Sequence, residues 1–150
     1  MKRPHLVRIG ALGLAAIALL LANVLVASAD PLTVTFTANS AGQVNRIGQV
    51  TVSGTLSCDV PGSNAFINGQ VTQLSGRAQL SGSFNFNGTC GPTPAPWTAT
   101  LRADNGIFTG GNAKLTIYNV QACGFNGYFY ECTSASGLPS TISLKLKGGP

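Results

Sequence analysis

QVTVSGTLSC, residues 49–58, alternates between apolar and polar side chains along most of its length. Val50, Val52 and Leu56 fall on one face of an extended chain, whereas threonines and serines occupy the other face. A period of two residues is typical of a β-strand with one face buried, while an amphipathic helix would repeat every 3.6 residues. The stretch therefore predicts a strand that is half buried in a β-sheet.

The same alternation recurs along the rest of the chain, and no window shows the periodicity of a helix. Seven segments carry the alternation, the third of them weakly: residues 32–38, 49–58, 65–74, 77–86, 97–103, 112–120 and 141–147. Turn-forming Gly, Pro, Asn and Asp residues separate these segments. Seven short strands in roughly 120 residues are typical of a β-sandwich. We therefore expect an all-β fold, an antiparallel immunoglobulin-like β-sandwich of about seven strands with two disulfides.

The first 29 residues have the order of a secretory signal peptide. Basic residues within 1–8 precede an apolar run over 9–26, and Ala27-Ser28-Ala29 follows as a small-residue cleavage site. We expect cleavage between Ala29 and Asp30, which leaves residues 30–150 as one secreted domain, extracellular or associated with the cell envelope. The alternative is an uncleaved membrane anchor, because the apolar run approaches the length of a spanning helix. After cleavage we expect no attachment to a membrane.

All four cysteines lie in the part that we expect to be exported. An even number of cysteines in an oxidising compartment predicts two disulfides, and four cysteines allow three pairings. We favour the sequential pairs Cys58–Cys90 and Cys123–Cys132, which close loops of moderate length. A zinc site is the weaker alternative, because the spacing contains no C-x-x-C pair and no histidine lies nearby.

The charged residues exclude several classes of function. Three of the nine Lys and Arg lie in residues 1–8, so residues 30–150 carry six against four Asp and Glu, a net charge of 6 − 4 = +2. With no basic cluster along the sequence, we expect no nucleic-acid partner. The only histidine, His5, leaves with the signal, so the secreted domain can have neither a Ser-His-Asp catalytic triad nor a metal site with a histidine ligand. We therefore expect that the protein is not an enzyme and holds no cofactor or metal. We also expect a monomer.

CGFNGYFYEC, residues 123–132, contains the densest group of aromatic residues in the chain. Its Asn126-Gly127 pair predicts a type I′ turn in a disulfide-closed hairpin. Alternation would then direct Tyr128 and Tyr130 outward and Phe129 toward the core. Two exposed tyrosines are good contact makers for sugars, peptides or planar ligands, so we take Tyr128, Tyr130 and Phe125 as candidate binding residues. The alternative is that these rings cover an open end of the sandwich.

Two further features concern glycines and prolines. Gly54 and Gly82 interrupt predicted strands and would leave room for a large side chain, for which Trp97 is the candidate. We expect Trp97 to lie in the core with its indole N–H bound to a carbonyl oxygen.

The Pro-rich segment 90–97 is the candidate contact loop of a protease inhibitor, or else a rigid connection between two sheets.

Several motifs give the chain a family resemblance. The chain resembles small exported bacterial β-sandwich domains of unknown function in VTVSGTLSC, NGTC, the W-x-A-x-L run, GIFTGGNAKL and the late cysteine pair. The likeness covers most of residues 49–132. The chain is also loosely similar to the neocarzinostatin-type apoproteins, exported immunoglobulin-like sandwiches with two disulfides and a chromophore cleft. The first cysteine pair is spaced more widely here than in those apoproteins, so the resemblance assigns no binding residue.

These observations together predict a secreted, non-enzymatic binding module. We expect its partner to be an extracellular polymer or a protein that contacts loops at one end of the domain. The alternatives are a small-molecule carrier, which requires a cleft, and a protease inhibitor that acts through residues 90–97.

Overall fold

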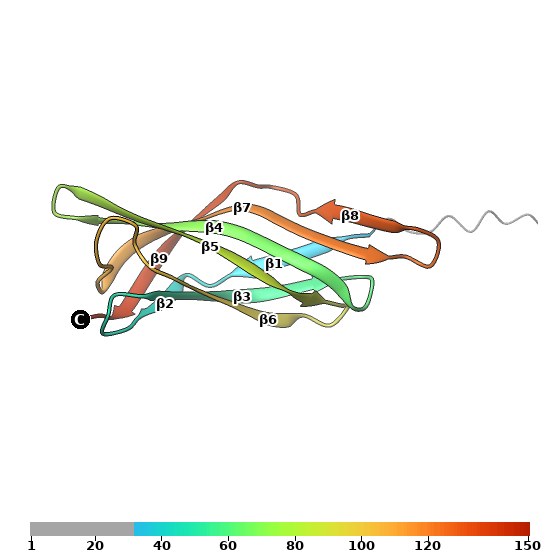
Figure 1. Cartoon of the computed structure of the whole chain (residues 1–150), viewed down its shortest axis with the longest axis horizontal. Coiled ribbons are helices and arrows are strands. Elements are labelled where there is room, and N and C mark those ends of the chain that lie inside the picture. Colours follow the sequence, from blue (N-terminus) through green and yellow to red (C-terminus); the bar gives the residue numbers. More distant parts are fainter. Residues whose placement is uncertain (1–31) are drawn as a thin grey trace, which may run out of the picture.

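The computed structural model describes residues 32–150, and every regular element in this range is a β-strand (Figure 1). The predicted signal segment 1–29, the cleavage residues Ala29 and Asp30, and Pro31 lie outside the described residues. The strands are β1 (Val34–Ala38), β2 (Ala41–Val44), β3 (Val50–Cys58), β4 (Ser63–Ser75), β5 (Ala78–Cys90), β6 (Ala95–Leu101), β7 (Gly111–Phe125), β8 (Tyr130–Ser134) and β9 (Ser140–Gly148). The prediction of an all-β fold is confirmed, and no helix that could cross a membrane occurs in residues 32–150.

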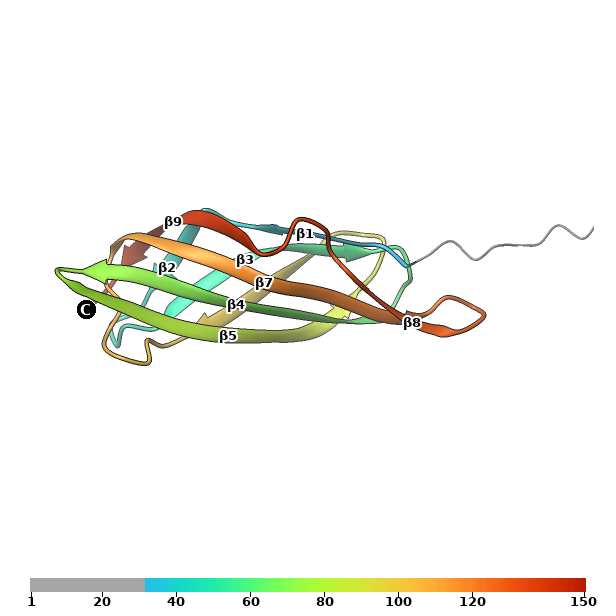
Figure 2. The ribbon, with the colours of Figure 1, turned by 90° about the horizontal axis from the view of Figure 1, so that it is seen from above.

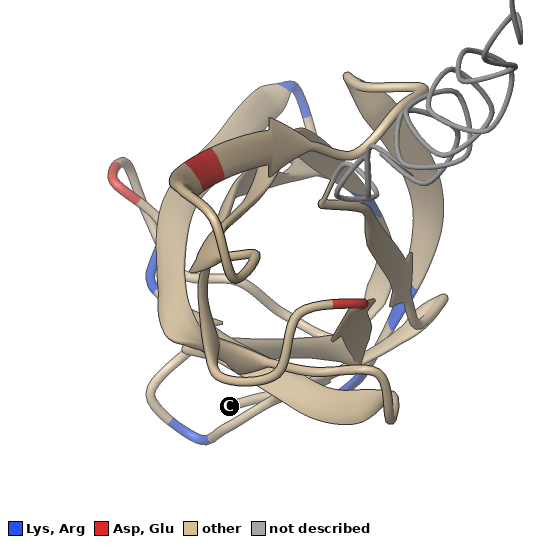
Figure 3. Cartoon of the chain, turned by 90° about the vertical axis from the view of Figure 1, so that its right-hand side faces the viewer, with Lys and Arg blue, Asp and Glu red and all other residues tan. Residues whose placement is uncertain are grey.

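The strands form one mixed sheet rather than a purely antiparallel one. Its order is β1-β3-β2-β9-β7-β4-β5, with β6 added to β3 and β8 added to β7. All pairs are antiparallel except β2 with β9, which run parallel. Seen end-on, the strands surround the core (Figure 3). The expected count of about seven strands was too low and the expected antiparallel sheet was wrong, because β2 and β8 and the parallel pair were not foreseen.

The parallel pair arises where the first part of the chain changes partner. β1 pairs with the second half of β3, and β2 pairs with its first two residues. Between them, the Asn39 amide donates to the Ser53 carbonyl oxygen, and the Ser40 carbonyl accepts from the Lys145 amide. β2 thereby joins β9 as well as β3. The four residues of β2 are too few to display a clear alternation, so only pairing with a strand 100 residues away reveals this strand.

The inward face of the sheet is a continuous apolar core around Trp97. This side chain is 1% exposed, and its indole N–H donates to the Thr37 carbonyl oxygen at 2.9 Å. Phe84 stacks against the indole with ring centroids 6.1 Å apart, and Phe86 lies 6.2 Å away at a tilt. The expected core position and hydrogen bond of Trp97 are confirmed.

One of the two interrupting glycines makes room for the indole, and the other does not. A Cβ at Gly54 would lie 2.7 Å from the Trp97 indole nitrogen and would overlap the Thr37 carbonyl. Gly82 instead faces the backbone of Arg102 on the neighbouring segment. Both glycines therefore allow a close approach between segments, but only Gly54 admits Trp97, and the expectation for Gly82 was wrong.

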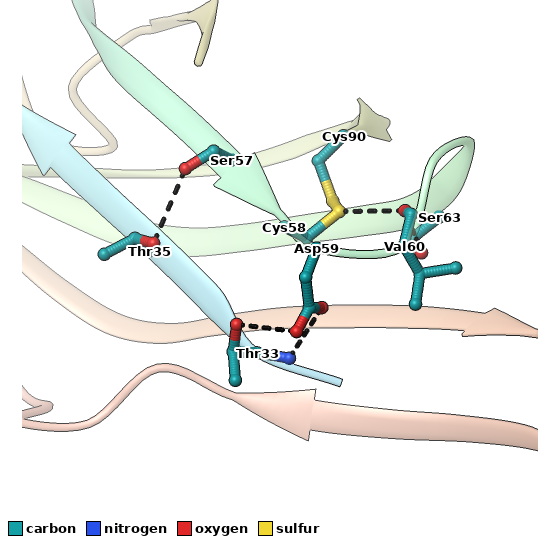
Figure 4. The surroundings of a disulfide bond; sticks show 8 residues. All are labelled: Thr33, Thr35, Ser57, Cys58, Asp59, Val60, Ser63 and Cys90. Atoms are coloured by element: carbon teal, nitrogen blue, oxygen red, sulfur yellow. Dashed lines mark hydrogen bonds between the residues drawn. A yellow bond between two sulfur atoms is a disulfide. The ribbon is translucent and has the colours of Figure 1, made fainter. Parts of the chain in front are cut away.

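The two disulfides lie toward the same end of the elongated domain. Cys58 pairs with Cys90, which joins the ends of β3 and β5, two strands that do not pair with each other (Figure 4). Cys123 pairs with Cys132 across β7 and β8. The structure thus contains both disulfides, in the pairing that the sequence spacing favours. We call this end of the molecule, which includes residues 59–63 and 126–129, the hairpin end.

Candidate functional site

The β7–β8 hairpin projects beyond the rest of the sheet at the hairpin end (Figure 2). β7 pairs with β8 from Gln121↔Ser134 out to Phe125↔Tyr130, so the loop proper has four residues, 126–129. Cys123 and Cys132 stand directly opposite each other in this ladder, with Cα atoms 4.0 Å apart. The disulfide therefore links the two strands just before the point where the hairpin carries its aromatic residues.

Asn126 organises the four-residue loop through its side chain. Its Oδ1 accepts from the backbone N–H groups of Tyr128 and Phe129, both at 3.1 Å, and its own N–H donates to the Phe129 carbonyl. Gly127 has a positive φ of 95°, but Asn126 does not. A type I′ turn requires positive φ at both central residues, so the type I′ prediction was wrong. The amide side chain of Asn126 fixes the loop instead, in the manner of an Asx turn.

All four aromatic side chains of the hairpin face solvent. The exposed fractions are 60% for Phe125, 66% for Tyr128, 55% for Phe129 and 61% for Tyr130. The rings therefore do not cover an end of the core. The expected burial of Phe129 was wrong because residues 128 and 129 belong to the loop, where strand alternation does not apply. The three candidate residues Phe125, Tyr128 and Tyr130 lie together, and Phe129 joins them.

Glu131 connects this hairpin to the first described residue of the chain. Its Oε1 accepts from the Leu32 backbone N–H and from the Asn126 side-chain amide, both at 2.9 Å. At the same end, the Asp59 carboxylate accepts from the backbone N–H and the hydroxyl of Thr33, also at 2.9 Å (Figure 4). Asp59 and Glu131 are far apart in the sequence. The structure shows that these two carboxylates hold the first described residues, Leu32 and Thr33, against the hairpin end.

We expect Glu131→Ala to lower the free energy of unfolding by about 1–2 kcal/mol, because it removes the acceptor of two hydrogen bonds. Glu131→Gln keeps an acceptor oxygen of the same length and is the matched control, with a smaller loss. Chemical denaturation followed by circular dichroism measures both. Equal stability of Glu131→Ala and the unmodified protein would show that Glu131 does not anchor Leu32.

The Pro-rich segment is shorter as a loop than the sequence suggests. β6 begins at Ala95, and Pro96 and Trp97 pair with Thr55 and Gly54 of β3. Residues 91–94 alone form the connection between β5 and β6. A protease that approached this segment would therefore meet four residues flanked by sheet.

A groove that the sequence did not indicate lies on the outer surface, away from the hairpin end. It has a volume of about 1040 Å³ and is bordered by β4, β5, β7, β9 and the loop before β7. Its lysines, Lys114 and Lys145, are far apart in the sequence and became neighbours through the pairing of β7 with β9. No sequence pattern marks this site, because its residues come from separate strands and loops.

Within residues 32–150, no group of three His, Cys, Asp or Glu side chains could hold a metal ion. A scan against models of protein families finds no match for the chain. A search of curated proteins finds no similar sequence either.

Proposed function

We propose that the protein is an exported, non-enzymatic binding module whose aromatic hairpin, residues 123–132, is the contact surface. The partner is an extracellular or cell-envelope polymer or protein. The single observation that carries this proposal is the exposure of four neighbouring rings on one short hairpin. Large apolar side chains exposed together are unusual on a monomeric protein and mark interaction sites.

The stiffness of the hairpin supports the same proposal. The Cys123–Cys132 disulfide, the Asn126 hydrogen bonds and the Glu131 contact with Leu32 restrain the loop before any partner arrives. A loop that is already ordered loses less conformational entropy on binding. Tyrosine adds a large contact area with few rotatable bonds, and its hydroxyl provides a hydrogen bond.

We expect the double variant Tyr128→Ala/Tyr130→Ala to weaken binding at least about tenfold, since two anchor rings each contribute on the order of 1 kcal/mol or more. The melting temperature should stay nearly unchanged because both rings are exposed. Co-sedimentation with purified cell-wall sacculi, chitin and cellulose, together with capture from culture supernatant, measures binding.

Tyr118→Ala is the matched control, because Tyr118 is 51% exposed on β7 but lies outside the hairpin. This variant should bind as the unmodified protein does. A hairpin variant that loses stability and keeps full binding would refute the assignment of the hairpin as contact surface.

We further propose that the sheet has the arrangement of an immunoglobulin-like sandwich. The support for this proposal is that β3 and β6 run along one side of the molecule and β4 and β7 along the other (Figure 1), and that β5 pairs with β4. A disulfide between two strands that do not pair and a buried tryptophan are also features of that architecture. The likeness to small exported bacterial β-sandwich domains belongs to the same proposal.

The two other candidate functions find less support in the geometry. The inhibitor hypothesis is confined to residues 91–94, and incubation with secreted proteases tests for inhibition or cleavage there. The carrier hypothesis requires a pocket that encloses most of a small ligand. The groove of Lys114 and Lys145 is half open, which suits a chain that passes along it better than an enclosed molecule.

A further inference from the structure

The fold gathers basic side chains that are scattered in the sequence. All six Lys and Arg of residues 32–150 lie toward the end opposite the hairpin, which we call the basic end: Arg46, Arg77, Arg102, Lys114, Lys145 and Lys147. The pairings Val44↔Val50↔Leu101, Gln43↔Lys147, Asn112↔Lys145 and Thr72↔Lys114 bring their segments together. Of the three carboxylates described, Asp59 and Glu131 lie at the hairpin end and only Asp104 lies at the basic end. The basic residues therefore form no cluster along the sequence but are gathered at one end of the folded domain.

The groove of about 1040 Å³ lies within this basic end. The exposed side chain of Leu74 lines the groove, and no Asp or Glu of residues 32–150 does. The polar side chains along it are hydroxyls, amides and two ammonium groups, among them Thr72, Gln79, Asn112, Lys114, Ser143 and Lys145. Their strands lie side by side, with Thr72 opposite Lys114, Lys114 opposite Ser143, and Asn112 opposite Lys145. The groove is thus positively charged and combines neutral hydrogen-bonding side chains with an apolar surface at Leu74.

The lysines of the groove keep their charge available for a ligand. Lys145 Nζ donates to the Asn112 Oδ1 at 3.1 Å, which is a neutral partner. An ammonium has three donors, so this contact orients the side chain without neutralising it. Lys114 lies between Thr72 and Ser143, which are also uncharged. Among residues 32–150, neither lysine therefore faces a carboxylate that a ligand would have to displace.

We propose that this groove binds an acidic polysaccharide, a sugar chain that bears carboxylate, sulfate or phosphate groups. The anionic groups would pair with Lys114 and Lys145 as charge-assisted hydrogen bonds. Sugar hydroxyls would exchange hydrogen bonds with the threonine, serine, asparagine and glutamine side chains. The half-open shape admits a polymer that enters and leaves the groove. This site is separate from the aromatic hairpin and does not depend on its function.

The test compares polymers of different charge on the full chain, produced in a host that exports it and immobilised on a sensor. Dextran sulfate and polygalacturonate should bind, and dextran, which has the same backbone as the first but no charge, should not. Raising the salt concentration from 0.05 to about 0.5 M should weaken binding, because it shortens the screening length. Single-stranded DNA is the control polyanion, because its sugars lack the free hydroxyl groups of a polysaccharide.

The double variant Lys114→Gln/Lys145→Gln should bind dextran sulfate about tenfold more weakly, as expected for the loss of two partly exposed ion pairs. Arg46→Gln/Arg77→Gln removes the same charge from turns at the basic end outside the groove, and it should lower affinity less than about threefold. Equal losses of affinity in the two variants would show that binding comes from the overall positive charge of the basic end and not from the groove. Absence of polysaccharide binding, or equally tight binding of DNA, would overturn the proposal.

Discussion

Trp97→Ala is expected to lower the free energy of unfolding by about 3–5 kcal/mol, the cost of truncating a large aromatic side chain in a packed core. The indole is 1% exposed and lies against Phe84 and Phe86, which would both lose contacts to the resulting cavity. The Thr37 carbonyl would also lose its donor. Small domains have total stabilities of about 5–15 kcal/mol, so this variant should be the least stable of those considered.

Urea denaturation followed by far-ultraviolet circular dichroism is the appropriate measurement, because Trp97 is the sole tryptophan and its fluorescence disappears with the substitution. Trp97→Phe is the matched control. It keeps an aromatic ring but lacks the N–H, and we expect it to lose about 1–3 kcal/mol from the unpaired carbonyl and the smaller ring. A loss below about 1.5 kcal/mol for Trp97→Ala would mean that the core collapses around the site, and that Trp97 does not organise it.

The double variant Cys58→Ala/Cys90→Ala is expected to lose about 3–4 kcal/mol, because the disulfide closes a loop of 32 residues and restricts the unfolded chain. Both cysteines are also nearly fully buried at the ends of β3 and β5. The bond joins strands that do not pair with each other, and a hydrogen bond from the Cys58 N–H to the Gly91 carbonyl oxygen at 2.9 Å lies beside it. Its removal therefore leaves fewer contacts between the two strand ends in the folded protein.

Cys123→Ala/Cys132→Ala is the matched comparison, since it also removes one disulfide but from a loop of 9 residues. The expected loss of unfolding free energy is smaller, about 2.5–3 kcal/mol. The local loss of structure should be confined to the hairpin. Hydrogen exchange distinguishes the two variants: protection should fall at the ends of β3 and β5 in the first and in β7–β8 in the second. A larger loss from the hairpin variant would contradict the loop-length explanation.

Several features of the fold could be predicted from local patterns. The alternation in residues 49–58 and 141–147 identified β3 and β9 nearly to the residue, because a half-buried strand needs only its own sequence to display a period of two. The size of the sole tryptophan, together with strands that glycines interrupt, was sufficient to predict the burial of Trp97 and its hydrogen bond. The cysteine spacing favoured the disulfide pairs that the structure contains.

Other features required contacts between distant residues. The loop at 126–129 adopts its shape through the Asn126 side chain, and this moved Phe129 from a strand position into solvent. Residue types alone do not distinguish that loop from a tight two-residue turn. Likewise, β2 forms only with partners from β3 and β9, so its four residues carried no recognisable signal.

The sequence by itself determined that residues after the apolar segment form a β-structure with a tryptophan in its core and two disulfides. Strand alternation and the burial of a large ring depend on the residues themselves, and disulfides depend on an even number of cysteines. Only the tertiary structure decided where the surface groups meet. It placed four rings on one projecting hairpin and six cations at the opposite end. The physical reason is strand pairing: the register of β4, β7 and β9 makes Thr72, Lys114 and Ser143 neighbours although they are distant along the chain.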